Sequence, residues 1–208
     1  PYMCGFEGES TEHLCARWYQ TGTLYPFSRN HNMEYMRHQE PYAMGETLLQ
    51  AARISLRTRY SLLKHYYSLF LRLNGTGTVF RPLFFEFPND SKLYDHSQDY
   101  VSTQYLVGES LMVTPVLGLL ASKVDAYFPQ ATWYDFYNGS LIKNSTQSSS
   151  VIAIHNKANE AVPIFLRGGH IVATQDVTGV NRSDDLSSNF TLIVALENTN
   201  TTIVSRSY

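Results

Sequence analysis

A long stretch of helical periodicity gives way to a succession of strand-like runs near residue 79, and this change constrains the fold most. Apolar residues recur at helical spacing from Glu46 to Leu73, and Asn74-Gly75 then supplies a stop signal. Further on, short runs rich in β-branched and aromatic residues alternate with turn signals, which is typical of an antiparallel sandwich. The sequence therefore predicts two parts, residues 1–78 and residues 79–208.

The second part is predicted to consist of many short strands separated by turns and by a mobile polar loop over Lys143–Ser150. The runs predicted as strands are Val79–Phe87, Val101–Val107, Leu111–Leu117, Val124–Phe128, Trp133–Tyr137, Val151–Ile154, Val162–Leu166, His170–Ala173 and Phe190–Leu196.

The first part has the order of elements that the end of a (β/α)8 barrel would have. Ser10 or Thr11 can cap a helix that runs through Gln20. A short aromatic strand is predicted at residues 24–28, followed by a loop over residues 33–45 and the long helix. One or two β/α repeats cannot bury a core alone, so this part needs the upstream remainder of the same protein. We expect the isolated chain to aggregate or to stay partly molten.

Composition excludes several classes of partner. Charged residues make up only 16% of the chain, the formal net charge is −2, and no cluster of Lys and Arg occurs, so neither nucleic acid nor an anionic membrane is an expected partner. No apolar run reaches the ~18 residues of a membrane-spanning helix. No sequence motif for a metal or another cofactor is present, and none is expected.

The distribution of asparagine predicts passage through the secretory pathway. Seven of the twelve asparagines begin an Asn-x-Ser/Thr acceptor for N-glycosylation, where chance would give only one or two. The alternative is that a chain rich in Ser, Thr and Asn produces such triplets by accident. The candidate glycosylation sites are Asn74, Asn89, Asn138, Asn144, Asn181, Asn189 and Asn200.

Two cysteines, Cys4 and Cys15, are the only ones in the chain. Their spacing would let them close a small loop as a disulfide, which an oxidising compartment would permit. Free thiols are the alternative, and a metal site that includes His13 is a weaker one because it lacks further ligands at short spacing.

Self-contained catalytic machinery is absent from the sequence. The carboxylates Asp125, Asp135, Asp184 and Asp185 stand in hairpin-like or loop-like surroundings, which favours solvated surface. One polar run, residues 29–32, follows the predicted aromatic strand, and in a β/α barrel the C-terminal ends of strands face the active site.

The polar run and the residues near the first cysteine are the candidates for function. If the polar run faces the active site of a barrel, His31 would be functional, although a lone His at a strand end is more often structural. Phe6 would line the same end of the barrel, where it could stack on a sugar or simply pack.

A collinear set of motifs resembles the family 31 glycoside hydrolases, and in particular their lysosomal and brush-border α-glucosidases. It extends in order to about residue 175, with a weaker echo at Phe190–Leu196. The motifs are Cys4-Gly5-Phe6 with Cys15, Arg17-Trp18-Tyr19-Gln20, Tyr25-Pro26-Phe27-Ser28-Arg29-Asn30-His31-Asn32, Gln39-Glu40-Pro41, Arg57-Thr58-Arg59-Tyr60-Ser61-Leu62-Leu63, Arg81-Pro82-Leu83-Phe84-Phe85-Glu86-Phe87, Thr114-Pro115-Val116-Leu117, Ala126-Tyr127-Phe128-Pro129, Thr132-Trp133-Tyr134-Asp135 and Leu166-Arg167-Gly168-Gly169-His170-Ile171-Val172.

The resemblance implies a fragment of a retaining α-glucosidase that releases terminal non-reducing α-linked glucose from oligosaccharides or from glycogen-like or starch-like chains. Both catalytic aspartates would lie upstream of this chain, so no catalytic residue is expected within it. The resemblance implies that His31 hydrogen-bonds glucose hydroxyls, that Phe6 forms part of the pocket wall and that Arg29 supports the His31 loop. It also implies a Cys4–Cys15 disulfide and a lysosomal, secreted or cell-surface location.

One position departs from the family pattern. The family usually has an aspartate two positions before the first cysteine, and here that position is Tyr2. Loss of this charge favours an alternative reading, a non-catalytic relative that acts as a sugar-binding or structural glycoprotein.

Overall fold

The computed structural model describes residues 2–72, 74–95, 97–178, 188–197 and 204–207, which form two compact units. Unit 1 comprises Pro1–Arg59, Pro115–Val124 and Ile154–Val162. Unit 2 comprises Tyr60–Thr114, Asp125–Ala153 and Pro163–Tyr208. The candidate acceptors Asn181 and Asn200 and the carboxylates Asp184 and Asp185 lie outside the described residues.

Unit 1 begins with a strand–helix–strand arrangement, β1 (Tyr2–Met3), α1 (Glu12–Gly22) and β2 (Arg29–Asn30), in which the two strands pair in parallel. The predicted cap of α1 is confirmed, because the Thr11 hydroxyl accepts a hydrogen bond from the Leu14 amide at 3.2 Å. The helix extends two residues beyond the predicted end at Gln20, to Gly22.

The predicted strand at residues 24–28 is wrong, because the strand is Arg29–Asn30. The Arg59 guanidinium donates to the carbonyl oxygens of Thr23, Tyr25 and Pro26, the last two at 2.6 and 3.1 Å. The Leu24 and Tyr25 amides donate back to the carbonyls of Thr21 and Gly22 at 3.4 and 3.1 Å, so the chain leaves α1 in turns and not as a strand.

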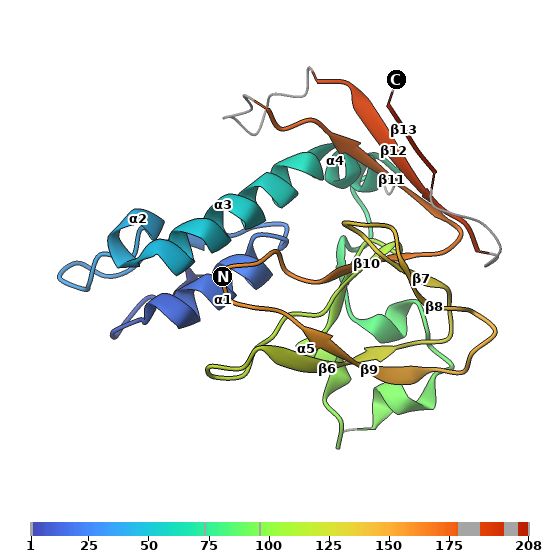
Figure 1. Cartoon of the computed structure of the whole chain (residues 1–208), viewed down its shortest axis with the longest axis horizontal. Helices are drawn as coiled ribbons and strands as arrows, with labels where there is room; N and C mark the ends of the chain where they lie inside the picture. The colour runs from blue at the N-terminus through green and yellow to red at the C-terminus, as the bar shows by residue number, and fades with distance from the viewer. Residues whose placement is uncertain (1, 73, 96, 179–187, 198–203, 208) are drawn as a thin grey trace. The chain divides into compact units, whose positions relative to one another are not determined.

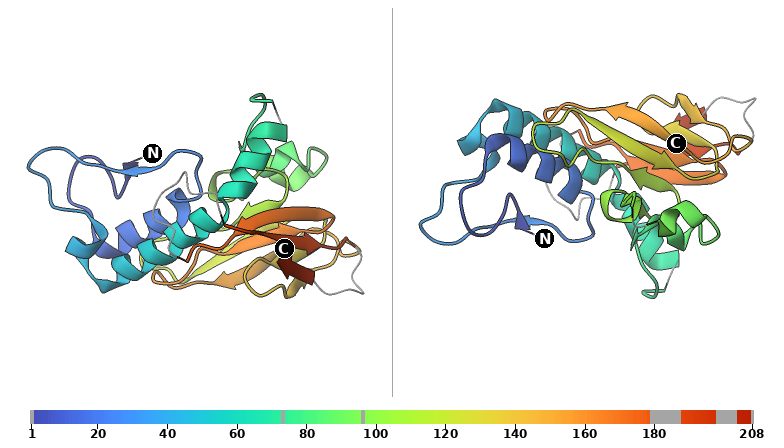
Figure 2. Two further views of the ribbon diagram at one scale, coloured as in Figure 1. Left: turned by 90° about the horizontal axis from the view of Figure 1, so that it is seen from above. Right: turned by 90° about the horizontal axis from the view of Figure 1, so that it is seen from below.

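Three helices follow β2: α2 (Pro41–Met44), α3 (Glu46–Ser61) and α4 (Leu63–Arg72). The short helix α2 lies in the segment predicted as a loop, with Pro41 at its favourable first turn. The single predicted helix over residues 46–73 is divided at Leu62 alone, and the Tyr66 amide still donates to the Leu62 carbonyl at 3.0 Å. α1 and α3 lie side by side (Figure 2), and their buried residues, among them Cys15, Ala16 and Leu48, share one apolar cluster.

Two polar side chains of α1 hold segments that lie far along the chain. The Arg17 guanidinium donates to the Asn156 side-chain and main-chain oxygens at 2.9 and 3.0 Å and to the Ala121 carbonyl at 2.5 Å. The Gln20 amide donates to the carbonyls of Lys157 and Glu160 at 2.8 and 2.7 Å. Segments beyond the predicted boundary at residue 78 therefore belong to unit 1.

Unit 2 contains a six-stranded sheet in which all pairs are antiparallel (Figure 1). Its strands, in order across the sheet, are β3 (Phe80–Arg81), β4 (Tyr105–Val107), β5 (Leu111–Val113), β10 (Ile164–Arg167), β7 (Trp133–Asp135) and β8 (Leu141–Lys143).

Five further strands among the described residues form two smaller sheets. The first is a three-stranded antiparallel sheet of β11 (His170–Gln175), β12 (Phe190–Ala195) and β13 (Val204–Ser207). The second pairs β6 (Lys123–Phe128) with β9 (Ser150–His155).

Aromatic side chains form the centre of unit 2. Phe128 packs edge-on against Trp133 and Phe165, with ring centroids 6.2 and 4.8 Å apart, and all three are buried. Gly168, in the turn between β10 and β11, lies so close to Thr132 that a Cβ would approach its side chain to 2.8 Å. A Cβ on Gly168 would also lie 3.0 Å from the Leu196 carbonyl, so the absence of a side chain at Gly168 lets these neighbours approach closely.

Parts of two predicted strands are helical instead. In Val79–Phe87, only Phe80–Arg81 is a strand, and the 3-10 helix η1 (Leu83–Phe85) follows Pro82, which has no amide to donate to a neighbouring strand. In Val101–Val107, α5 (Tyr100–Thr103) precedes β4, and the Thr103 hydroxyl donates back to the Asp99 carbonyl at 3.0 Å.

Several shorter elements also differ from expectation. A further 3-10 helix, η2 (Ser91–Tyr94), is capped by the Asp90 side chain, and β8 and β13 were not expected from the sequence. No helix among the described residues has the length and apolar character needed to cross a membrane.

Candidate functional site

The ends of two neighbouring parallel strands bring the predicted site residues together. β1 and β2 pair with Tyr2 opposite Arg29 and Met3 opposite Asn30. Because the strands are parallel, the segment after β1, which contains Phe6, and the segment after β2, which contains His31, emerge at the same edge. The Phe6 and His31 ring centroids are 5.8 Å apart. Both side chains are exposed, Phe6 at 40%.

The turn that presents Phe6 is fixed by a disulfide. Cys4 and Cys15 are joined, which confirms the predicted pairing and ties the end of β1 to α1. Cys4 and Gly5 both have positive φ, 71° and 98°, so the chain turns sharply directly after the strand. Both cysteines are buried, whereas Phe6 is not.

The two segments also bind each other through the main chain and one buried amide. The Met33 amide donates to the Phe6 carbonyl at 3.0 Å. Gln39, which is buried, donates through its side chain to the Gly5 carbonyl at 3.1 Å and to Asn30 Oδ1 at 2.8 Å, and Asn30 Nδ2 donates in return to the Gln39 carbonyl at 2.7 Å. This network fixes the positions of both segments relative to each other.

Asn30 and Asn32 have structural partners. Besides its bonds to Gln39, the Asn30 amide donates to the Tyr19 hydroxyl at 3.2 Å, and burial raises the pKa of that hydroxyl above its usual value. Asn32 donates to the Arg37 carbonyl at 2.8 Å within its own loop. Of the polar run at residues 29–32, His31 is the side chain turned to solvent without a hydrogen bond to the described residues.

Tyr2 joins the cluster from the position where the sequence departs from the family pattern. The Arg29 guanidinium donates to the Tyr2 hydroxyl and lies 4.3 Å from the centroid of its ring. The Tyr2 ring is 4.9 Å from that of Phe6 and 5.9 Å from that of His31. Arg29 therefore contacts Tyr2, which in turn lies beside both of the predicted sugar-binding residues.

A hollow of about 550 Å³ opens beside the cluster. It is lined by the loop that follows β2, including His31, and by Tyr19 and Gln39. The volume lies in the range of small-molecule sites, and the lining carries polar groups together with aromatic rings. Such a lining can hydrogen-bond hydroxyl groups and pack against apolar ring faces.

The sequence predicts roles in sugar binding for Phe6, Arg29 and His31, and these stay predictions; it assigns no role to Gln39. Gln39 begins the Gln39-Glu40-Pro41 motif, but its position inside a polar loop carries no signal that its amide is buried. Tyr2 was singled out only as a departure, and its contact with Arg29 follows from the parallel register of β1 and β2.

Together these features define the end of a β/α barrel, with side chains gathered at the C-terminal ends of its strands, joined to an antiparallel β-domain. Comparison with known proteins gives the family. Residues 2–69 match the model of the glycosyl hydrolases family 31 TIM-barrel domain, and residues 76–172 match that of the glycosyl hydrolase family 31 C-terminal domain. The chain belongs to glycosyl hydrolase family 31.

Curated relatives are similar over most of the chain. The chain is 39% identical to a lysosomal acid alpha-glucosidase of Tetrahymena pyriformis, over 98% of its own length and 23% of the relative's. It is also 39% identical to the lysosomal alpha-glucosidase of Bos taurus, over 93% of the chain and 21% of the relative. It is thus similar to about a quarter or less of these proteins.

Solved structures agree in fold. The alpha subunit of a glucosidase II superposes with a TM-score of 0.79 and 30% identity over 95% of this chain and 21% of its own. A Flavobacterium johnsoniae dextranase complexed with glucose superposes with a TM-score of 0.80 and 25% identity over 96% and 24%. These relatives are enzymes, which does not favour the alternative of a non-catalytic glycoprotein.

Proposed function

We propose that this chain is part of a retaining α-glucosidase and that it supplies one side of the pocket for the terminal glucose. The observation that carries the proposal is the pairing of Phe6 and His31, with ring centroids 5.8 Å apart, at the ends of two parallel strands. The substrate would be an oligosaccharide or a glycogen-like or starch-like chain with a terminal non-reducing α-linked glucose. Residues 1–78 would complete the catalytic barrel, and residues 79–208 would form the β-domain that follows it.

The residues of this chain would bind and orient the sugar. His31 would hydrogen-bond its hydroxyls through the ring nitrogens, and Phe6 would provide an apolar wall for the face of the ring. Arg29 would hold Tyr2 beside both residues. Fixing the sugar in this way places its anomeric carbon for attack, and misplacement by about 1 Å can cost on the order of 10²-fold in rate.

The bond-breaking step would belong to two aspartates in the upstream part of the parent protein. One carboxylate would attack the anomeric carbon while a second carboxylic acid protonates the leaving oxygen, and water would then hydrolyse the glycosyl-enzyme. Retention by this route needs two carboxyl groups roughly 5–5.5 Å apart. The parent would pass through the secretory pathway to a lysosomal, secreted or cell-surface location.

The experiment that tests the proposal is hydrolysis of a chromogenic α-glucoside by the parent protein, natural and with His31→Ala. We expect kcat/KM to fall by about 100-fold in the variant, because a hydrogen bond to a buried sugar hydroxyl is lost and the sugar is less well oriented. His155→Ala is the matched control, since His155 is an exposed histidine on β9.

Two outcomes would count against the proposal. Equal turnover by the natural and His31→Ala proteins would remove His31 from the pocket. Absence of turnover in the natural protein, with glucose still bound, would instead support a non-catalytic sugar-binding glycoprotein.

A further inference from the structure

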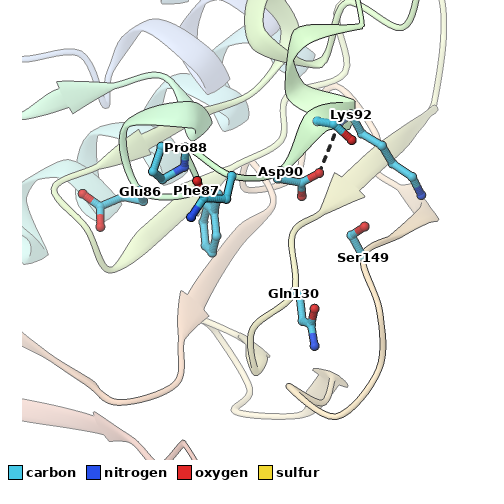
Figure 3. Close-up of a pocket in the computed structure, with 9 residues that line it drawn as sticks. Glu86, Phe87, Pro88, Asp90, Lys92, Gln130 and Ser149 are labelled. Atoms are coloured by element: carbon cyan, nitrogen blue, oxygen red, sulfur yellow. Dashed lines mark hydrogen bonds between the residues drawn. The ribbon is translucent and has the colours of Figure 1, made fainter.

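A second hollow, of about 450 Å³, lies entirely within unit 2 and shares no lining residue with the hollow described above. Three segments line it: residues 86–92, Gln130 and Ser149. Figure 3 shows Gln130 and Ser149 across the hollow from Asp90. We call this hollow the Asn89 cleft, because the candidate glycosylation acceptor Asn89 is part of its wall.

The acceptor triplet Asn89-Asp90-Ser91 is held rigidly at the edge of this cleft. Asp90 accepts a hydrogen bond from the hydroxyl of the buried Tyr127 at 2.6 Å and another from the Lys92 amide at 3.2 Å. The Asp90 amide donates to the Phe87 carbonyl at 3.1 Å. The side chain between the acceptor asparagine and its serine is therefore anchored to β6.

Asn89 itself is free to carry a substituent. Its side chain is exposed, and its amide has no hydrogen-bond partner in the part of the chain that the structure describes. The acceptor Asn138 differs, because its Oδ1 accepts a hydrogen bond from the Ser140 amide at 2.8 Å in an exposed hairpin turn. A group attached to Asn89 would begin at the wall of a cleft, whereas one attached to Asn138 would begin at a turn.

The lining of the cleft suits a sugar. Lys92 and Gln130 are exposed and contribute an ammonium and a carboxamide, and Ser149 contributes a hydroxyl. These groups are of the kinds that donate hydrogen bonds to, and accept them from, sugar hydroxyl and acetamido groups. The Gln130 amide also donates to the Ser145 carbonyl at 3.3 Å and keeps its side-chain oxygen as an acceptor. A covalently attached sugar is also present at a high effective concentration, so weak contacts suffice to hold it.

We propose that Asn89 carries an N-linked glycan whose first sugar lies in the Asn89 cleft against Lys92 and Gln130. The proposal rests on the secretory location proposed above, because the glycan is added only there. Its consequence is that this glycan is held against the protein and is poorly accessible, unlike a glycan that projects from a turn.

The test uses the full parent protein secreted from eukaryotic cells. Mass spectrometry of peptides gives the occupancy of each acceptor, and a time course with a peptide N-glycosidase on the folded protein gives the rate of glycan release. We expect Asn89 to be occupied and its glycan to be released about tenfold more slowly than that of Asn138, as one or two net hydrogen bonds would give. After denaturation the two rates should be equal.

A double variant, Lys92→Ala with Gln130→Ala, tests the cleft directly. Both side chains are exposed, so the fold should tolerate their loss. We expect release from Asn89 to rise to the rate at Asn138, with no change at Asn138. Gln98→Ala with Lys157→Ala removes the same two kinds of group from exposed positions outside the cleft and should change neither rate.

The possible failures are distinguishable. An occupied Asn138 with a bare Asn89, equal release rates in the folded protein, or no effect of the double variant would overturn the cleft proposal alone. A secreted α-glucosidase in which no acceptor is occupied would overturn it without touching the proposed activity. Retention of the parent in the cytosol would overturn both the cleft proposal and the proposed location.

Discussion

Tyr2, the residue that departs from the family pattern, makes its own set of contacts in the candidate site. An aromatic ring at this position gives Arg29 a hydroxyl and a π face as partners, where the family pattern would give it a carboxylate. The ring also contacts Phe6 and His31. The side chain is therefore part of the packing of the site and not merely a missing charge.

Replacing Tyr2 by Phe separates these two contributions. The Tyr2→Phe variant keeps the ring contacts and loses the hydroxyl that accepts from Arg29. We expect kcat/KM of the parent on a chromogenic α-glucoside to fall about fivefold, which corresponds to one net hydrogen bond of about 1 kcal/mol. Tyr2→Asp restores an acceptor for Arg29 and should retain more activity than Tyr2→Leu, which supplies none.

Tyr42→Phe is the control for Tyr2→Phe, because Tyr42 is exposed on α2. A Tyr2→Phe protein with unchanged kcat/KM would mean that the bond to Arg29 has no part in binding the sugar.

At the scale of elements, one carboxylate connects two helices of unit 1. Glu12 stands in the first turn of α1, and its Oε1 accepts hydrogen bonds from the Thr47 and Leu48 amides at 2.8 and 3.3 Å, at the start of α3. It therefore caps a helix to which it does not belong. Gly45 leaves room for it: a Cβ there would lie 2.3 Å from Glu12 Oε1, and its φ of 145° is rarely adopted by other residues.

We expect Glu12→Ala to destabilise unit 1 by about 1–2 kcal/mol, as the loss of a helix cap does. In the Glu12→Ala variant of the parent protein, the Thr47 and Leu48 amides should exchange their hydrogens faster than in the natural parent. Glu34→Ala is the control, since Glu34 is exposed and caps no helix. Gly45→Ala should have a larger effect than Glu12→Ala; an unchanged exchange pattern in both variants would contradict the cap.

A second helix, α4, makes the stability of unit 2 depend on pH. His65 on α4 is buried beside Ser110, and burial lowers the pKa of its ring to about 4. Between pH 6.5 and 4 the unfolded chain binds a proton that the folded state does not. The free energy of unfolding should therefore fall as pH falls through this range, by about 2 kcal/mol between pH 7 and pH 5.

The measurement is the Tm of the parent at pH 7 and pH 5, for the natural protein and for His65→Gln. We expect the difference between the two pH values to shrink in the variant, whatever its absolute Tm. His155→Gln, which replaces an exposed histidine, should leave the difference as it is. An equal pH dependence in all three proteins would show that His65 titrates normally.

The sequence predicted those elements whose signals are local. The start of α1 follows from the Thr11 cap, and several strands of unit 2 follow from runs of apolar residues bounded by turns. The strand predicted at residues 24–28 is wrong because its first amides donate back to the end of α1, and Arg59, more than 30 positions away, binds the Tyr25 and Pro26 carbonyls. Likewise, the sequence does not indicate a role for Gln39, because its partners Gly5 and Asn30 are 34 and 9 positions away.

At the scale of the whole molecule, the chain spans only part of the length of the relatives it matches. It covers between 21% and 24% of the length of the relatives and structures described above. Several large apolar side chains of the helices are exposed in both units, among them Ile54 and Leu56 on α3 and Tyr67, Phe70 and Leu71 on α4. In a complete barrel such faces would be covered.

We therefore expect the isolated 208-residue chain to aggregate or to remain partly molten. Near-ultraviolet circular dichroism and a thermal melt of the purified chain measure this, with the full parent as the reference. A soluble monomer with a sharp near-ultraviolet spectrum and a cooperative melt would contradict the expectation.

The hydrogen bonds from α1 to the segments near residues 121 and 156 can form only after those segments have been synthesised. Arg17 and Asn156 are 139 positions apart, so when a ribosome has just released α1, the oxygens that will bind its guanidinium do not yet exist. The nascent chain must keep Arg17 hydrated until the later segment emerges, because a buried guanidinium without partners is costly. The beginning of this chain therefore completes its folding only after most of its length has been made.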